Sequence, residues 1–178
     1  MSNHLVIDPS EYVRVLRHLQ QNEHEQVAFG FASAESVANG VRLRVLEFYL
    51  VSSGELEIQT PRHVALTEEA QGKLIKMAWD RGASLVELHS HTNPRYSAQF
   101  SWSDLAGFET FVPHVWWRLR GRPYGAVVVA PSGFDALVWR MDPRQPERLD
   151  AMLVGADVWL PTNLTLTTFH NEVARAEA

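Results

Sequence analysis

Hydrophobic residues along this chain alternate between the spacing of helices and the spacing of strands, and this alternation restricts the fold more than any other feature. Apolar residues three or four positions apart predict helices over residues 8–20 and 67–81 and from residue 102 onward. Apolar runs predict strands over residues 26–31, 41–51, 56–58, 83–88, 126–130 and 136–140. A chain in which helices alternate with strands is typical of an α/β fold.

Capping and turn residues refine this prediction. Asp8 or Ser10 can cap the first helix. Pro113 is expected to interrupt the third helix, although the helical pattern continues to residue 119. The sequence Pro-Ser-Gly at residues 131–133 predicts a hairpin between the two strands that flank it. After about residue 143 the pattern weakens, and we expect short strands at residues 158–160 and 164–169.

Length and composition exclude several classes of protein. The 178 residues correspond to about one domain, so we expect a single domain over residues 1–178. The chain contains no cysteine, which excludes disulfide frameworks, thiolate metal sites and cysteine nucleophiles. The net charge of −5 argues against a protein that binds the phosphate backbone of nucleic acid.

Neither a membrane segment nor a targeting segment is expected from the sequence. It has no run of 18 apolar residues, so no segment should span a membrane. Residues 1–5 lack the basic and apolar regions of a signal peptide. We therefore expect a cytoplasmic protein.

The segment that indicates chemistry is His89-Ser90-His91, followed by Ser101 and Asp104. Side chains two positions apart at a strand end point to the same side, so His89 and His91 can direct two imidazoles at one point. Asp104 lies where the chain turns back to begin a helix, and its carboxylate could add a third ligand. Two nitrogens and one oxygen, with one position left for water, form the ligand set of a catalytic zinc site.

Each part of this pattern also has a simpler interpretation. A His-x-His sequence alone is a weak indication of a metal site. Ser101-x-x-Asp104 also matches a helix capping box, which only satisfies backbone N–H groups. The combination of a strand ending in His-Ser-His, a loop and Ser-x-x-Asp is much rarer than either part.

This combination resembles the motif of the JAMM (MPN+, or JAB-domain) zinc metalloproteases, over about residues 6–140. The resemblance implies a mixed sheet between helices, similar to the fold of cytidine deaminases. It also implies that His89, His91 and Asp104 bind one Zn²⁺ per chain. Glu25, just ahead of an apolar strand, would hold the attacking water and act as general base. Ser101 would donate to the oxyanion of the tetrahedral intermediate.

The chain departs from the family pattern in the loop after the second histidine. The family usually has proline directly after that histidine and about seven residues before the serine. Here Pro94 comes two positions later, and nine residues separate His91 from Ser101. An insertion of two residues costs little entropy and need not move the ligands, but it changes how a substrate would cross the loop.

Two other glutamates compete for roles in this site. Glu23 is the alternative to Glu25 as base, although its place nearer the helix end favours Glu25. Glu87 precedes His89 by two positions, so it could be a ligand or could orient one imidazole. A salt bridge between Glu87 and a basic residue is the simpler alternative.

The resemblance implies a hydrolase that cleaves an amide or isopeptide bond at the C-terminus of a ubiquitin-like or sulfur-carrier protein. Activating or conjugating enzymes of the same pathway would then be partners. Two alternatives remain open. One is an MPN-like scaffold that binds proteins without catalysis, and the other is a zinc amidase that acts on small peptides.

Overall fold

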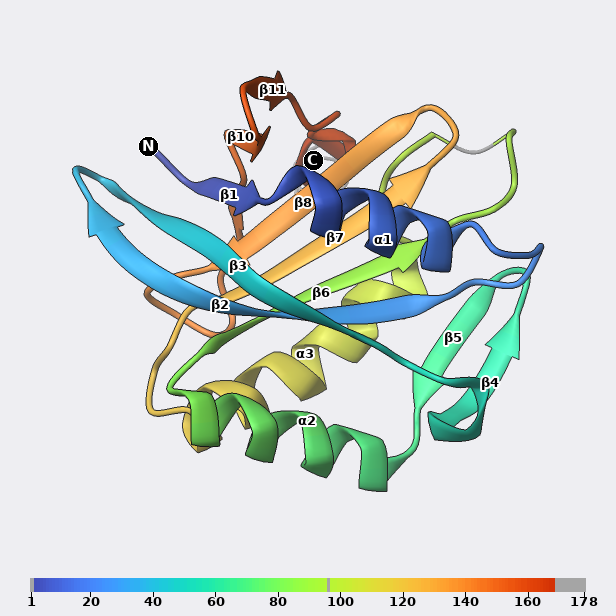
Figure 1. Cartoon of the computed structure of the whole chain (residues 1–178), viewed down its shortest axis with the longest axis horizontal. Coiled ribbons are helices and arrows are strands. Elements are labelled where there is room, and N and C mark those ends of the chain that lie inside the picture. The colour runs from blue at the N-terminus through green and yellow to red at the C-terminus, as the bar shows by residue number, and fades with distance from the viewer. Residues whose placement is uncertain (1, 96, 169–178) are drawn as a thin grey trace, which may run out of the picture.

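The computed structural model describes residues 2–95 and 97–168. In this part of the chain, a nine-stranded sheet has helices on both faces, and a separate two-stranded hairpin stands beside it (Figure 1). The helices are α1 (Pro9–Leu19), α2 (Glu68–Arg81) and α3 (Trp102–Arg118), with a short 3-10 helix, η1 (Ser53–Glu55). The strands are β1 (His4–Ile7), β2 (Val27–Val37), β3 (Gly40–Leu50), β4 (Leu56–Thr60), β5 (His63–Leu66), β6 (Ser84–Ser90), β7 (Tyr124–Ala130), β8 (Gly133–Trp139), β9 (Glu147–Arg148), β10 (Ala151–Val154) and β11 (Asp157–Trp159).

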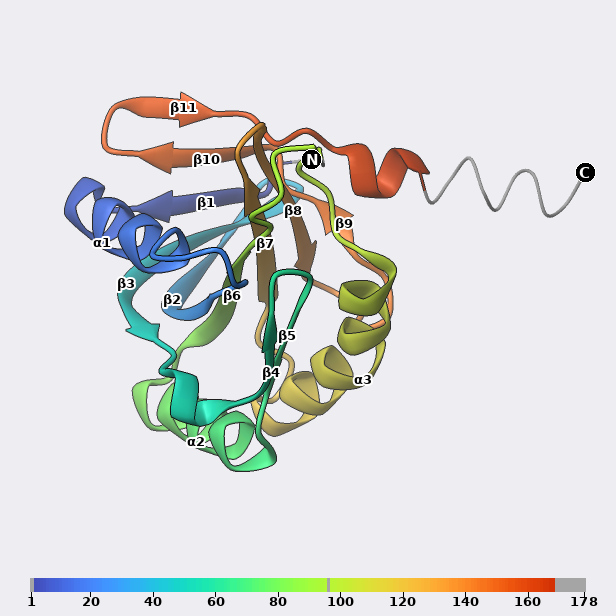
Figure 2. The ribbon, with the colours of Figure 1, turned by 90° about the vertical axis from the view of Figure 1, so that its right-hand side faces the viewer.

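The large sheet is mixed and has the order β11-β10-β1-β3-β2-β6-β7-β8-β9. The pairs β1–β10, β1–β3 and β6–β7 are parallel, and the other neighbours are antiparallel. Figure 2 shows the sheet curling, because the strands at the β11 end run across those at the β8 end. The α/β prediction is thus confirmed, as a curled mixed sheet with flanking helices.

Two hydrophobic layers hold the helices on the sheet. On one face, Val15 and Leu19 of α1 pack against β1, β3 and neighbouring strands. On the other face, α2 and α3 pack against β2, β6 and β7 through fully buried residues such as Leu74 and Val112. The strand β6 lies between these layers, and its apolar residues alternate between the two clusters. Its C-terminal end is therefore fixed from both sides.

The predicted interruption of the third helix is wrong, because α3 continues through Pro113. A proline within a helix removes one backbone hydrogen bond and crowds the preceding turn. Here the neighbouring Val112 and Val115 are 0% and 1% exposed, and their burial against the sheet holds the helix together across that position.

The C-terminal part contains one confirmed strand and one error. The strand expected at residues 158–160 is present as β11. The strand expected at 164–169 is wrong, since residues 164–168 are helical and residue 169 lies outside the described residues. The physical reason is Asp135 on β8, whose carboxylate accepts hydrogen bonds from the backbone N–H groups of Asn163 and Thr165 and so caps this turn.

Four strands lack a prediction from the sequence, and the two-residue strand β9 is one of them. Short strands β1 and β10 pair in parallel with each other, although almost the whole chain separates them. The hairpin partner of β4, the strand β5, is only half buried along its length.

Among the described residues, no helix has the length and apolar character needed to cross a membrane.

Candidate metal centre

The end of β6 places two histidines side by side. His89 is paired with Val27 of β2 and Val128 of β7. The backbone N–H of His91 continues the ladder by donating to the carbonyl of Val129 at 2.8 Å. Because the two side chains are two positions apart on an extended backbone, both point to the same side of the sheet.

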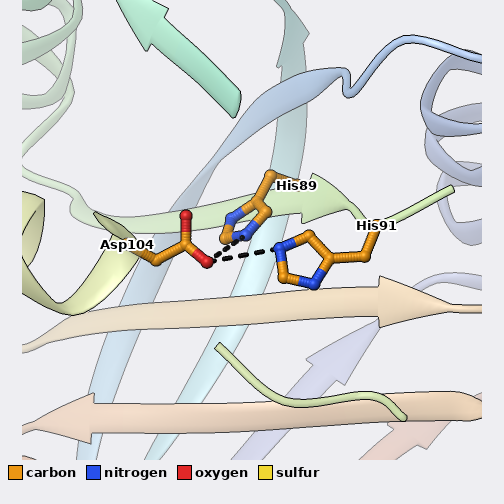
Figure 3. A group of neighbouring side chains, drawn as sticks. All are labelled: His89, His91 and Asp104. Atoms are coloured by element: carbon orange, nitrogen blue, oxygen red, sulfur yellow. Dashed lines mark ion pairs between the residues drawn. The ribbon is translucent and has the colours of Figure 1, made fainter. Parts of the chain in front are cut away.

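Asp104, in the first turn of α3, completes a group of three side chains. Its Oδ2 atom lies 3.5 Å from Nε2 of His89 and 3.2 Å from Nε2 of His91. Figure 3 shows both imidazoles directed at this one carboxylate oxygen. One ligand atom from each residue lies within 4.8 Å of the others, so the group could hold a metal ion.

Two buried polar atoms at this place have no hydrogen-bond partner among the described residues: Nε2 of His89 and Oε2 of Glu25. An unpaired buried polar group is costly, and native structures rarely keep one without a reason. A divalent cation beside His89 and a water beside Glu25 would supply both missing partners. The residues therefore fit a metal ion.

The structure brings Glu25, and not Glu23, to the group. Glu25 is 3% exposed, and its Oε1 lies 3.7 Å from Nε2 of His91. Its backbone is tied to β4, because its N–H donates to the carbonyl of Thr60 and its carbonyl accepts from the side chain of Gln59. Glu23 is exposed. Of the two candidates for a base, only Glu25 faces the histidines.

Glu87 lies behind His89 rather than among the ligands. Its Oε1 is 3.2 Å from Nδ1 of His89, and its Oε2 accepts a hydrogen bond from the hydroxyl of Tyr124 at 2.8 Å. Within the described chain, no lysine or arginine forms a salt bridge with Glu87. A carboxylate on Nδ1 favours the tautomer with the proton on that nitrogen and leaves Nε2 free to bind a metal. Glu87 thus orients His89.

The pKa values of these groups are shifted by burial and by each other. Burial raises the pKa of Glu25, although the neighbouring histidines, His91 first, oppose the shift. Burial disfavours a charged His89, but the carboxylates of Asp104 and Glu87 together outweigh it and raise the pKa of His89. Burial likewise opposes ionisation of Asp104, but the charge of His89 and the hydrogen bonds from His89, His91 and Ser101 together overcome it and lower the pKa of Asp104 far below its usual range. A metal ion must displace the proton on His89, so metal affinity should fall as pH decreases.

Ser101 is both a helix cap and a neighbour of the metal-binding group. Its hydroxyl donates to Oδ2 of Asp104 at 2.7 Å and accepts from the backbone N–H of Asp104 at 3.2 Å. Its own N–H donates to the same carboxylate oxygen at 2.7 Å. The capping-box interpretation is therefore confirmed, and it ties the hydroxyl directly to a candidate ligand.

Two cavities of about 270 Å³ each adjoin the group. The first is lined by Glu25, His91 and Ser101 together with the turn between β4 and β5 at Pro61 and Arg62. The second lies between β5 and α3, and its walls include Asp104, Glu87, His63, Phe29, Phe108 and Phe111. A substrate could therefore extend to both sides of the candidate ligands.

Several residues of this region were not predicted from the sequence. Tyr124 gave no signal because its partner Glu87 is 37 residues away. His63 has no ligand spacing, yet its Nδ1 is buried without a hydrogen-bond partner among the described residues, and it lines the second cavity. Such contacts form between residues that the fold brings together, so a local sequence pattern cannot predict them.

Comparison with known proteins gives a likeness of fold. No family model and no curated protein matches the chain. A structural-genomics target protein from Desulfitobacterium hafniense, solved in solution, has a similar structure with a TM-score of 0.50 and 15% sequence identity. The match covers 86% of this chain and 94% of that protein. At this identity the likeness concerns the fold alone.

Proposed function

We propose that this chain is a zinc-dependent amide hydrolase of the JAMM type, with a fold similar to cytidine deaminases. The observation that carries the proposal is the convergence of Glu25, the two histidines and Asp104, with two buried atoms that lack partners among the described residues. Two imidazole nitrogens and one carboxylate oxygen, with a further position for water or substrate, are typical ligands of catalytic zinc. Zinc, when bound, supplies a positive charge that polarises the substrate carbonyl and lowers the pKa of a water molecule.

Glu25 is the general base of this mechanism. Its buried carboxylate, with Oε2 unpaired among the described residues, can accept a proton from the attacking water. It can then return the proton to the leaving amine. The raised pKa of Glu25 makes its carboxylate a stronger base than an exposed one. Ser101, which lines the same cavity, can turn its hydroxyl from Asp104 to the oxyanion of the tetrahedral intermediate.

The β4–β5 hairpin supports an extended protein tail as the substrate. Within the described residues β5 pairs only with β4, and all four residues of β5 line the second cavity together with α3. An extended peptide can add to such a free strand edge through backbone hydrogen bonds. We therefore propose the C-terminus of a ubiquitin-like or sulfur-carrier protein as the substrate, cleaved in the cytoplasm beside the activating or conjugating enzymes of that pathway.

The experiment that tests this function uses a ubiquitin-like protein that carries a short peptide after its C-terminus. We expect the zinc-loaded chain to release the peptide, as followed by mass spectrometry, and a zinc chelator to abolish the release. Alkylating reagents should leave it unchanged, since the chain has no cysteine. Cleavage of short peptides with no cleavage of the fused protein would instead indicate a small-peptide amidase. Binding of the fused protein without cleavage would indicate a scaffold.

Replacing Ser101 with Ala should affect both turnover and stability. Loss of one oxyanion donor lowers turnover by about 10²–10³-fold. Loss of the cap hydrogen bond on Asp104 N–H lowers the free energy of unfolding by about 1 kcal/mol. Turnover and thermal unfolding measured on the same variant check the two effects.

Ser103→Ala is the matched control, because Ser103 lies two residues away and its hydroxyl forms a hydrogen bond with that of Ser101, not with Asp104. We expect this control to keep near-normal turnover. A Ser101→Ala variant that is less stable but fully active would show that Ser101 is only a cap.

A further inference from the structure

The loop that joins the two halves of the candidate centre is held by the C-terminal part of the chain. The described loop residues, 92–95 and 97–100, form neither helix nor strand. Ala98 and Phe100 are nevertheless only 0% and 5% exposed. Buried backbone groups need hydrogen-bond partners, and a loop without regular structure must find them elsewhere.

The partners of the buried residues Ala98 and Phe100 come from two distant segments. The N–H of Ala98 donates to the hydroxyl of Ser132 in the β7–β8 turn at 3.0 Å. The carbonyl of Ala98 accepts from the hydroxyl of Thr162 at 2.5 Å. The N–H of Phe100 donates to the hydroxyl of Thr165 at 3.0 Å, in a fully buried contact. Two of the three contacts therefore come from residues 162–165.

Thr165 is itself fixed by the buried carboxylate of Asp135. Oδ2 of Asp135 accepts from both the hydroxyl of Thr165, at 2.6 Å, and its backbone N–H, at 2.9 Å. Oδ1 accepts from the N–H groups of Asn163 and Ala136. A threonine hydroxyl has a single hydrogen, and that hydrogen goes to Asp135. The oxygen of Thr165 is therefore left as the acceptor for Phe100.

Phe100 connects the braced loop to the candidate ligands through its ring and through the next residue. Its ring packs edge-on against His89, with centroids 5.6 Å apart, and against Phe108 of α3, at 5.3 Å. The next residue, Ser101, binds Oδ2 of Asp104 through both its N–H and its hydroxyl. A displacement of Phe100 would move the ring beside His89 and the residue that holds Asp104.

We infer that residues 162–165 form a brace for loop residues 97–100, with Asp135 and Thr165 as positioning residues. The brace holds the part of the loop that directly precedes Ser101, at Ala98 and Phe100. The effect of the brace on catalysis rests on the proposed function, whereas its effect on the loop does not.

The test is Thr165→Val, which keeps the shape of the side chain and removes the hydroxyl. Hydrogen exchange of the Phe100 amide, followed by NMR on the full chain, should become about tenfold faster or more, because this N–H loses its buried acceptor. In the zinc-loaded protein, turnover of the fused ubiquitin-like substrate should fall by roughly 10- to 100-fold, as expected for misplaced catalytic groups. Thr165→Ser should restore both values.

Thr167→Val is the matched control, because its exposed hydroxyl donates to the carbonyl of Asn163 within the same segment and not to the loop. It should leave both readouts unchanged. If Thr165→Val fails to fold, Thr162→Val, which loses only the contact with Ala98, should show a smaller increase in Phe100 exchange.

The outcomes separate the brace from the proposed function. If the Phe100 amide of Thr165→Val exchanges at its original rate, the brace is overturned. If Thr165→Val does not fold, an unchanged exchange rate in Thr162→Val would overturn it instead. Faster exchange with unchanged turnover would overturn its role in positioning the site. An original chain that cleaves no amide would refute the proposed function, and the exchange rates would still decide whether the brace exists.

Discussion

Glu25→Gln is expected to lower turnover by roughly 10²–10⁴-fold while zinc content and fold stay unchanged. Glutamine has the size of glutamate but cannot accept the proton of the attacking water. Glu25 lies 3.7 Å from the nearest histidine nitrogen and is not one of the three grouped ligands, so the metal ion should remain. Turnover, zinc content by elemental analysis and the thermal unfolding temperature are the measurements.

Glu23→Gln is the control for this experiment, since Glu23 is exposed and the substitution leaves its backbone carbonyl, which accepts from Thr92, unchanged. We expect this variant to keep its activity. An active Glu25→Gln variant with an inactive Glu23→Gln variant would assign the base to Glu23. Loss of folding in Glu25→Gln would point to a structural role for the buried carboxylate.

Local sequence patterns predict much of this fold, because the spacing of apolar residues shows which face of a single helix or strand is buried. The amphipathic spacing in α1 and α2 and the apolar run of β6 are short-range features that the sequence carries directly. The strands β1 and β10 have four residues each and depend on pairing between the two ends of the chain. The turn at residues 164–168 alternates apolar and polar residues like a strand, and the distant carboxylate of Asp135 makes it helical.

The candidate site likewise contains some residues that local patterns predict and others that depend on long-range contacts. Strand geometry predicts that His89 and His91 share a side, and the capping pattern places Asp104 in the first turn of a helix. Glu25 enters the prediction only through the resemblance to a family. The contacts of Glu87 with Tyr124 and of Asp135 with Thr165 cross 37 and 30 residues. Such long-range partners become visible only when the sheet brings the strands together.

Asp104→Ala should remove the metal ion. The Oδ2 atom of Asp104 faces the Nε2 atoms of both histidines, so this variant loses the one anionic ligand of the group. Removing even a residue that only orients a ligand typically costs 10–100-fold in metal affinity, so the loss of a ligand should exceed about 100-fold. Zinc content after dialysis and a competition titration with a coloured chelator measure this change.

Asp104→Asn separates the two roles of this carboxylate. An amide oxygen can still accept from the N–H of Ser101, so the cap and most of the stability should remain. The amide lacks the negative charge that balances a divalent cation and raises the pKa of His89. We therefore expect Asp104→Asn to unfold near the temperature of the original chain and still to bind zinc weakly. Stoichiometric zinc in both variants would place the metal elsewhere and remove the basis for JAMM-type chemistry in this chain.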